Sequence, residues 1–116
     1  MNTKIRIIET TAFSDRIAEL LAKHSLLQED YNVFKKELAE NPEKGDPLTG
    51  TGGVRKVRLK SSSRGKSGGF RVCYLYYVLG EAIYLLFIFQ KNEQENLSAA
   101  QKKALKNITD AIKGKK

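Results

Sequence analysis

Seven basic residues occur between Thr51 and Arg71, and this segment contains no acidic residue. They are Arg55, Lys56, Arg58, Lys60, Arg64, Lys66 and Arg71. Residues 1–50 hold 7 Lys and Arg against 9 Asp and Glu, so the net charge of +8 is concentrated in this segment. Such a segment attracts polyanions, nucleic acid first and anionic membranes second, while a solvated surface that serves solubility is the alternative. The chemistry indicated is the binding of phosphate.

A nucleotide-binding loop is one possible phosphate site. The run KSSSRGKSGGFR, residues 60–71, contains the Gly-Lys-Ser of such a loop. That loop requires G-x-x-x-x-G-K-[ST] and then a helix, whose N-terminus helps to hold the phosphates. Lys60 stands where the first glycine is required, and the residues after Ser67 predict a strand. We therefore expect a flexible connection instead, in which Arg64 and Lys66 contact a long anionic ligand.

The residues just before this connection predict a strand with a cationic face. The run VRKVRLK, residues 54–60, alternates with period two. Alternation puts Lys56, Arg58 and Lys60 on one face, about 7 Å apart, and Arg55 with the apolar residues on the other. This separation is close to the phosphate repeat of an extended nucleic acid strand.

Hydrophobic patterns elsewhere predict the elements that hold this strand. An Ile-rich stretch at residues 4–9 predicts a strand, and apolar residues at helical spacing between Phe13 and Asn41 predict a helical hairpin. The apolar runs 70–79 and 82–89, separated by two residues, predict a tight β-hairpin of central strands.

Helix starts are indicated by S-x-x-Q capping boxes at Ser25 and Ser98. The second of these is followed by Leu105, Ile108 and Ile112, which indicate the apolar stripe of a C-terminal helix. The order β-α-α-β-β-β-α predicts an α+β class domain spanning residues 1–116. We expect a small, antiparallel-rich sheet with the helical hairpin packed on one face, a C-terminal helix, and the helices together on that face.

Several functional classes are disfavoured by composition. With one Cys and one His, the chain predicts no metal site, no internal disulfide and no cofactor, and Cys73 is expected to be a buried thiol. His24 ends a helical stripe and is interpreted as a packed helix-end residue rather than a catalytic base. No signal peptide or membrane-spanning stretch is found in the sequence, so we expect a cytoplasmic protein.

Three motifs together resemble one family of bacterial proteins. They are GTGGVRKVRL at residues 50–59, GGFRVCYLYY at 68–77 and YLLFIFQKNEQENLS at 84–98. Their order and spacing are similar to those of the RelE/HigB group of type II toxins from toxin-antitoxin modules. The HigB branch is the nearest, because it combines a G-x-R-K-x-R strand, a G-G-x-R strand start and a K-N-E after the last strand. The resemblance covers nearly the whole chain, since the predicted element order is also that of the RelE-like fold.

This resemblance implies a ribosome-dependent mRNA endonuclease that cuts codons in the A site of the 30S subunit and inhibits translation. It also implies a cognate antitoxin, which in the HigB branch is a HigA-like helix-turn-helix DNA-binding protein, and no membrane or small-molecule cofactor. By matching motifs, the paired basic positions are Lys56 and Arg58, the basic residue that starts the third strand is Arg71, and the basic residue after the last strand is Lys91. The tyrosine positions of the family fall near Ser98 and on Phe89, neither of which carries a phenol.

The chemistry that such a site must perform can be assigned to residue types. Arg58 and Arg71 can each make two parallel hydrogen bonds to phosphate oxygens, which suits them to stabilise a phosphorane transition state. Like-charge repulsion among cations eases proton loss from a lysine, so Lys56 or Lys91 is the candidate acid or base, with Glu93 a weaker one. The remaining cations, Arg55, Lys60, Arg64 and Lys66, are expected to bind the RNA backbone.

Two other functions remain open at this point. A ParE-like toxin has the same fold and poisons DNA gyrase through protein contacts, but its members generally lack so dense a basic strand and loop. A non-catalytic RNA-binding module is the second alternative, and the missing tyrosine and missing site histidine favour it.

Overall fold

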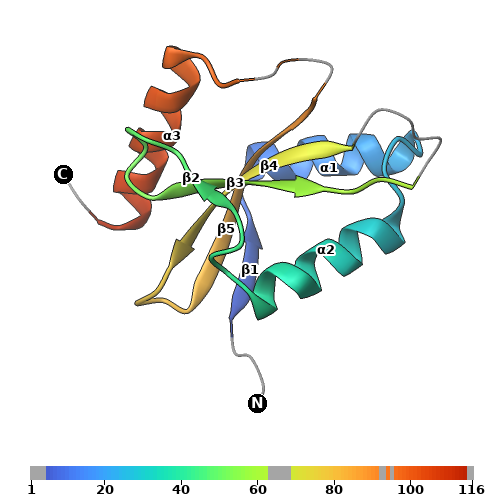
Figure 1. The fold of residues 1–116 in the computed structure, drawn as a ribbon, viewed down its shortest axis with the longest axis horizontal. Coiled ribbons are helices and arrows are strands. Elements are labelled where there is room, and N and C mark those ends of the chain that lie inside the picture. The colour runs from blue at the N-terminus through green and yellow to red at the C-terminus, as the bar shows by residue number, and fades with distance from the viewer. Residues whose placement is uncertain (1–4, 63–68, 92–93, 95, 115–116) are drawn as a thin grey trace.

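This computed structural model describes residues 5–62, 69–91, 94 and 96–114. Figure 1 shows a sheet with helices on either side of it. The elements, in chain order, are β1 (Arg6–Glu9), α1 (Thr11–Ala22), α2 (Gln28–Glu40), β2 (Asp46–Pro47), β3 (Val54–Leu59), β4 (Phe70–Tyr77), β5 (Ala82–Gln90) and α3 (Ala99–Ile112). The predicted order and the α+β class are confirmed, and the two-residue strand β2 is an addition to them.

The strands form one sheet in the order β1-β5-β4-β3-β2. β1 runs parallel to β5, and the other neighbouring pairs are antiparallel. β4 and β5 are central, as their apolar sequences predicted. The prediction of a two-residue turn between them is wrong, because residues 78–81 close a turn in which Glu81 N–H donates to the Val78 carbonyl (3.0 Å). Val78 and Leu79 are therefore exposed turn residues.

The two faces of the sheet carry separate hydrophobic cores. Phe13 of α1 and Phe34 of α2 pack on the face that includes Val57. Leu105 of α3 packs with Val54, which lies on the opposite face because side chains alternate along a strand. The expectation that all helices share one face is therefore wrong for α3, which lies across the sheet from the hairpin (Figure 1).

The helix ends show which sequence signals decide local structure. At α3, the capping box is confirmed: Ser98 Oγ accepts from Gln101 N–H (3.1 Å), and Gln101 Oε1 accepts from Ser98 N–H (2.9 Å). The box predicted at Ser25 does not form, because the Ser25 and Leu26 amides donate to the Leu20 carbonyl and α2 begins only at Gln28. The α2 end before Pro42 is confirmed, with Asn41 as the C-cap residue.

The apolar stripe of α3 differs from the predicted one by one position. Leu105 and Thr109 are buried, whereas Ile108 is 37% exposed. Thr109 faces the start of β3, since its Cγ2 lies 3.1 Å from the point that a Cβ at Gly52 would occupy. None of the helices in the described ranges has the length and apolar character needed to cross a bilayer.

Candidate functional site

The registers of β3, β4 and β5 bring three of the predicted site residues together. Arg58 lies directly opposite Arg71, and Lys56 lies opposite Cys73. Directly opposed residues of an antiparallel pair project from the same face. Lys56, Arg58 and Arg71 therefore share the face that carries α3, and we call these three residues the cationic face.

Aromatic residues of β5 continue these two rows. Phe89 lies opposite Arg71, and Phe87 lies opposite Cys73. The two rings contact each other at a tilt, with centroids 5.5 Å apart. Phe89 is buried and Phe87 is half-buried. On this face of the sheet, the basic side chains of β3 and β4 are therefore bordered by apolar side chains of β5. The sequence predicted the central strands but not that these aromatic residues would border the cations.

The electrostatics of the cationic face are unfavourable in the protein alone. Two like charges directly opposed across a strand pair repel each other, with Cβ atoms about 5 Å apart. No ion pair found within the described ranges involves Lys56, Arg58 or Arg71. The Arg71 guanidinium donates a long hydrogen bond to the Phe70 carbonyl (3.5 Å). An anion that bridged Arg58 and Arg71 would remove this repulsion.

The thiol beside this face is shielded from solvent. Cys73 is fully buried, and burial raises its pKa to about 12 against a weaker opposing effect of the Lys56 charge. A thiol protonated over the whole physiological range is a poor nucleophile and a poor metal ligand. The prediction of a buried thiol is confirmed.

Lys60 and Lys91 lie at the same end of the sheet as Arg58 and Arg71. Leu59, which precedes Lys60, and Gln90, which precedes Lys91, both pair with Phe70. Lys60 and Lys91 are exposed and flank β4 from its two neighbouring strands. The end of the sheet that Phe70 occupies is therefore bordered by basic residues on both sides.

Arg55 has a different environment from the other predicted contacts. Its Nη1 donates to the carbonyl oxygens of Gly45 (2.7 Å) and Glu43 (3.2 Å), on the face away from α3. These hydrogen bonds connect β3 with the turn that precedes β2. Arg55 therefore serves the fold and lies apart from the cationic face.

The predicted loop contacts Arg64 and Lys66, and the weaker proton-transfer candidate Glu93, lie outside the described residues. The chain on either side of residues 63–68 is held in place. Ser62 donates its amide (2.8 Å) and its hydroxyl (2.9 Å) to Asp30 of α2. Gly69 has φ +76°, and a Cβ there would overlap the Leu59 carbonyl oxygen. The G-G-x-R motif indicated Gly69, whereas no sequence pattern indicated Asp30.

Neither the single histidine of the chain nor Ser98 is placed to move a proton at the cationic face. Ser98 uses its hydroxyl as the α3 cap. The prediction of a packed His24 is wrong, because this residue is exposed in the turn after α1 with φ +58°. No group of three or more His, Cys, Asp or Glu able to hold a metal ion occurs within the described ranges.

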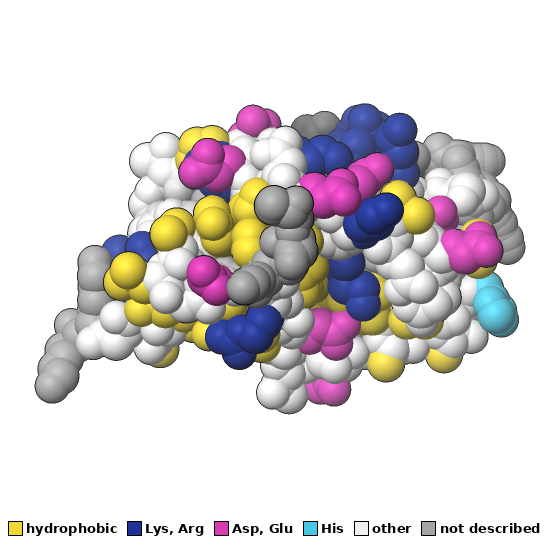
Figure 2. Space-filling model, turned by 90° about the horizontal axis from the view of Figure 1, so that it is seen from below, with side chains coloured by type: hydrophobic (Ala, Val, Ile, Leu, Met, Phe, Trp, Pro, Cys, Tyr) yellow, Lys and Arg dark blue, Asp and Glu magenta, His cyan; other side chains and the backbone are white. Residues whose placement is uncertain are grey.

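Charge is unevenly distributed over the side of the molecule that Figure 2 shows. On the side drawn in Figure 2, Lys and Arg side chains gather in one area, and Asp and Glu side chains border them. Hydrophobic side chains are also exposed on this side. A surface of mixed charge and apolar character suits a protein partner better than a polyanion.

The fold and the site define a small α+β protein in which basic side chains, without ion pairs to other described residues, project from one end of a five-stranded sheet. The chain belongs to the RelE toxin family, because the family model described as the RelE toxin of the RelE/RelB toxin-antitoxin system matches residues 40–116. The match spans β2 to α3 and includes every predicted site residue. This chain is therefore a toxin of a toxin-antitoxin system, and its family implies a cognate antitoxin.

Proposed function

We propose that this toxin is an mRNA endonuclease of the HigB branch that cuts codons in the ribosomal A site and so inhibits translation. The observation that carries the proposal is the Arg58–Arg71 pair, two guanidinium groups that are opposed on one sheet face and form no ion pair with any residue that the structure describes. A stable fold gains nothing from such a pair, and a bound phosphate group would stabilise it.

The reaction would use the 2′-hydroxyl group of the RNA as its nucleophile. Its oxygen attacks the adjacent phosphorus, the O2′–P bond forms, the P–O5′ bond breaks, and the products carry a 2′,3′-cyclic phosphate and a 5′-hydroxyl group. One proton leaves O2′ and one reaches O5′, so no cofactor or metal is required. The protein must align O2′ with the leaving oxygen and stabilise the charge that develops on the phosphorane.

Each cation has a role in this scheme. Arg58 and Arg71 bind the non-bridging oxygens and stabilise the phosphorane. Lys56 lies next to Arg58 on the same face, and Lys91 lies beyond the end of β5, so they are the proposed acid and base. Lys60, Arg64 and Lys66 contact the RNA backbone. We leave Arg55 out of this set because its guanidinium is bonded to backbone carbonyls.

A site made mainly of cations would act slowly on free RNA, because little in it aligns the 2′-oxygen. This supports a requirement for the ribosome, which presents the codon in a fixed conformation. The same proposal implies a cytoplasmic protein and a HigA-like antitoxin that binds DNA through a helix-turn-helix domain.

The test is translation of a reporter mRNA in a cell-free extract, followed by mapping of new 5′ ends. The parent toxin is expected to produce fragments cut within codons, and the Lys56→Ala, Arg58→Ala and Arg71→Ala variants are expected to produce few or none. A gyrase poison would leave translation untouched, and a passive RNA binder would create no new 5′ ends. Parent-level cleavage by all three variants would refute the assignment.

A further inference from the structure

A pocket of about 480 Å³ lies beside the second half of β5, where α1 begins. Its walls include Ala12 and Arg16 of α1, Phe87, Ile88 and Phe89 of β5, and Gln94 from the segment that follows β5. We call it the β5 pocket. It adjoins the cationic face, because Phe89 lies opposite Arg71 and forms part of the pocket wall. Neighbouring strands are about 5 Å apart, so one strand spacing separates the strand of Arg71 from this wall.

β5 has no neighbouring strand along this pocket among the described residues. β1 ends at Glu9, and the chain then enters α1. At this point the amide and the hydroxyl of Thr10 both donate to the Leu85 carbonyl (3.2 and 3.0 Å). Beyond Leu85, the side of β5 that faced β1 is therefore open.

A β-bulge determines which backbone groups face this open side. The pairing of β4 with β5 shifts next to Tyr74, so that Leu86 is an extra residue in β5. Before the bulge, the Leu85 carbonyl points towards β1. The extra residue shifts the alternation by one, so Ile88 rather than Phe87 directs its N–H and C=O to that side. The open side thus presents one donor and one acceptor next to each other.

The side chains of the pocket add an aromatic ring and an oriented amide. Phe87 is half-buried, and its ring contacts that of Phe89 at a tilt, with centroids 5.5 Å apart. The Gln94 side chain is held in one orientation, since its Nε2 donates to Gln101 Oε1 (2.9 Å) and its Oε1 accepts from Gln101 Nε2 (3.3 Å). A carboxamide oxygen has two lone pairs, so Gln94 Oε1 can accept one further hydrogen bond from an occupant.

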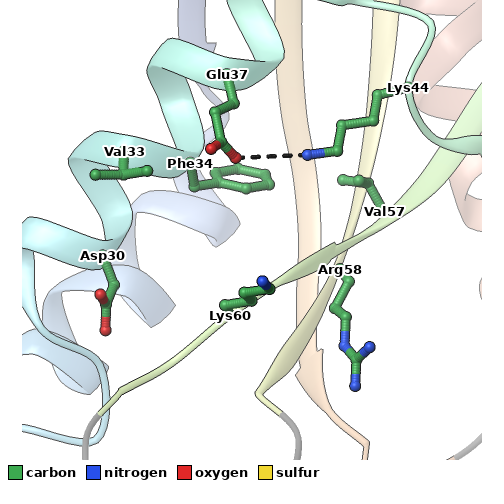
Figure 3. Close-up of a pocket in the computed structure, with 8 residues that line it drawn as sticks. All are labelled: Asp30, Val33, Phe34, Glu37, Lys44, Val57, Arg58 and Lys60. Atoms are coloured by element: carbon green, nitrogen blue, oxygen red, sulfur yellow. Dashed lines mark hydrogen bonds and ion pairs between the residues drawn. The ribbon is translucent and has the colours of Figure 1, made fainter.

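The charges of the β5 pocket differ from those of the groove between α2 and β3. That groove contains Asp30 and an ion pair between Glu37 and Lys44 (Figure 3). The described residues that line the β5 pocket include no acidic side chain, and their one cation, Arg16, is already bonded to Glu19 of the same helix (3.1 Å). The β5 pocket therefore suits an uncharged group with an aromatic face and a hydrogen-bonding edge.

A nucleobase has these properties. Bases stack on aromatic side chains and form hydrogen bonds through the donors and acceptors on their edges, and proteins that bind single-stranded RNA use both kinds of contact. A peptide strand fits less well, because strand addition uses the backbone groups of several alternate residues, whereas β5 ends at Gln90, two residues after Ile88. The adjoining cationic face supplies the phosphate contacts that a nucleotide also needs.

We propose that the β5 pocket receives one base of the mRNA codon that is cut at the cationic face. The base stacks on Phe87, and its edge bonds to the backbone N–H and C=O of Ile88 and to Gln94 Oε1. The phosphate of the same nucleotide lies at Arg71, on the other side of Phe89. This inference rests on the proposed function and adds to it a site that distinguishes one codon position from the other two.

The test uses purified ribosomes stalled with a defined codon in the A site. The messages lack the base of one codon nucleotide but keep its ribose and phosphate. Single-turnover cleavage by the parent toxin is expected to fall at least about 10-fold when one particular base is removed, since base–aromatic stacking is worth about 5- to 150-fold in affinity. Removal of either of the other two bases is expected to change the rate by less than about threefold.

Ala12→Phe tests the pocket itself, because a ring at this exposed lining position fills the space that the base would occupy. This variant is expected to cut the complete codon at least about 10-fold more slowly than the parent, with no further loss when the critical base is removed. Phe87→Leu keeps apolar bulk without the ring and is expected to give the same pattern. Ala18→Phe is the matched control, because Ala18 is also an exposed alanine of α1 but lies outside the pocket, and it is expected to behave as the parent does.

The possible results separate the inference from the proposed function. Equal effects of removing each of the three bases, or a position-specific loss that Ala12→Phe and Phe87→Leu both retain, would overturn the inference. Unchanged cleavage by Ala12→Phe together with weaker binding of the antitoxin would assign the pocket to a protein segment and would also overturn it. Failure of the proposed function gives a different result, since the parent toxin would then leave even the complete codon intact.

Discussion

Replacing Arg58 with glutamine is expected to make the toxin more stable and less active. Arg58 and Arg71 are opposed across β3 and β4, and the exposed Arg58 lies largely in water. With Cβ atoms about 5 Å apart, the guanidinium groups are roughly 7 Å apart, which gives a repulsion of about 0.6 kcal/mol at the dielectric constant of water. Glutamine keeps much of the aliphatic stem of arginine and removes only the charge, so most of this repulsion should be recovered as stability.

The stability gain can be recognised by its dependence on salt. For a domain of this size, about 0.6 kcal/mol raises the melting temperature by roughly 2–4 °C. The Debye length is about 10 Å at 0.1 M salt and about 3 Å at 1 M, so the difference between Arg58→Gln and the parent should largely vanish in 1 M sodium chloride. Phosphate ions should stabilise the parent more than the variant, because they bind between the two guanidinium groups.

Activity should change in the opposite direction. Loss of one group that stabilises the developing charge of a transition state typically lowers the rate by about 100- to 1,000-fold. We therefore expect Arg58→Gln to cleave ribosome-bound mRNA at least about 100-fold more slowly than the parent. Arg6→Gln is the control, since Arg6 is an exposed arginine on β1 at the other edge of the sheet, and it should change neither property.

The assay combines thermal unfolding at two salt concentrations with single-turnover cleavage. The account would be refuted if Arg58→Gln were less stable than the parent at low salt, or if it cleaved at the parent rate. Either result would mean that Arg58 and Arg71 are not a phosphate-binding pair whose charges repel each other in the free toxin.

Three further predictions concern residues around the site. Gly69→Ala should destabilise the fold and lower cleavage, measured by urea unfolding and the same cleavage assay, because φ +76° and overlap with the Leu59 carbonyl force the start of β4 to move. An unchanged cleavage rate would show that Arg71 is positioned independently of this glycine. Tyr74→Phe should cost about 2 kcal/mol of unfolding free energy, because the buried hydroxyl accepts from the Gly45 amide (2.9 Å) and also donates to a backbone carbonyl of the same turn (2.7 Å). Stability equal to the parent would mean that water replaces these bonds. Cys73 should react with a thiol reagent at pH 8 at least about 100-fold more slowly in the native toxin than in urea, because its pKa is raised to about 12. The raised pKa also means that the contribution of this thiol to stability is complete below pH 9 and is lost as the pH rises towards 12, which an unfolding series across that range would reveal.

Much of the sheet was predictable because a period-two pattern or a long apolar run is a local property of one stretch of sequence. The face shared by Lys56 and Arg58 followed from alternation within one strand. The position of Arg71 opposite Arg58 depends on how β3 and β4 are aligned, and a long connection does not fix that register. Only the folded chain therefore reveals that two predicted phosphate ligands repel each other.

Other features were missed because the same residue type serves several purposes. An S-x-x-Q pattern caps α3 at Ser98 but not α2 at Ser25, where the Leu20 carbonyl already accepts the Ser25 and Leu26 amides. Arg55 is as basic as its neighbours, yet its partners are carbonyl oxygens of a turn about ten residues earlier in the chain. β2 has two residues and pairs only with Arg55 and Lys56 of β3, and no local sequence pattern predicted this short strand.

The central claim is that the cationic face cleaves mRNA held in the ribosomal A site. The most direct measurement is primer extension on a purified ribosome complex stalled with a defined codon in the A site, using the parent toxin, Arg71→Ala and Arg6→Ala. The account predicts a new 5′ end within that codon for the parent and for Arg6→Ala, and none for Arg71→Ala. An intact message with the parent toxin, or an undiminished cut with Arg71→Ala, would contradict it.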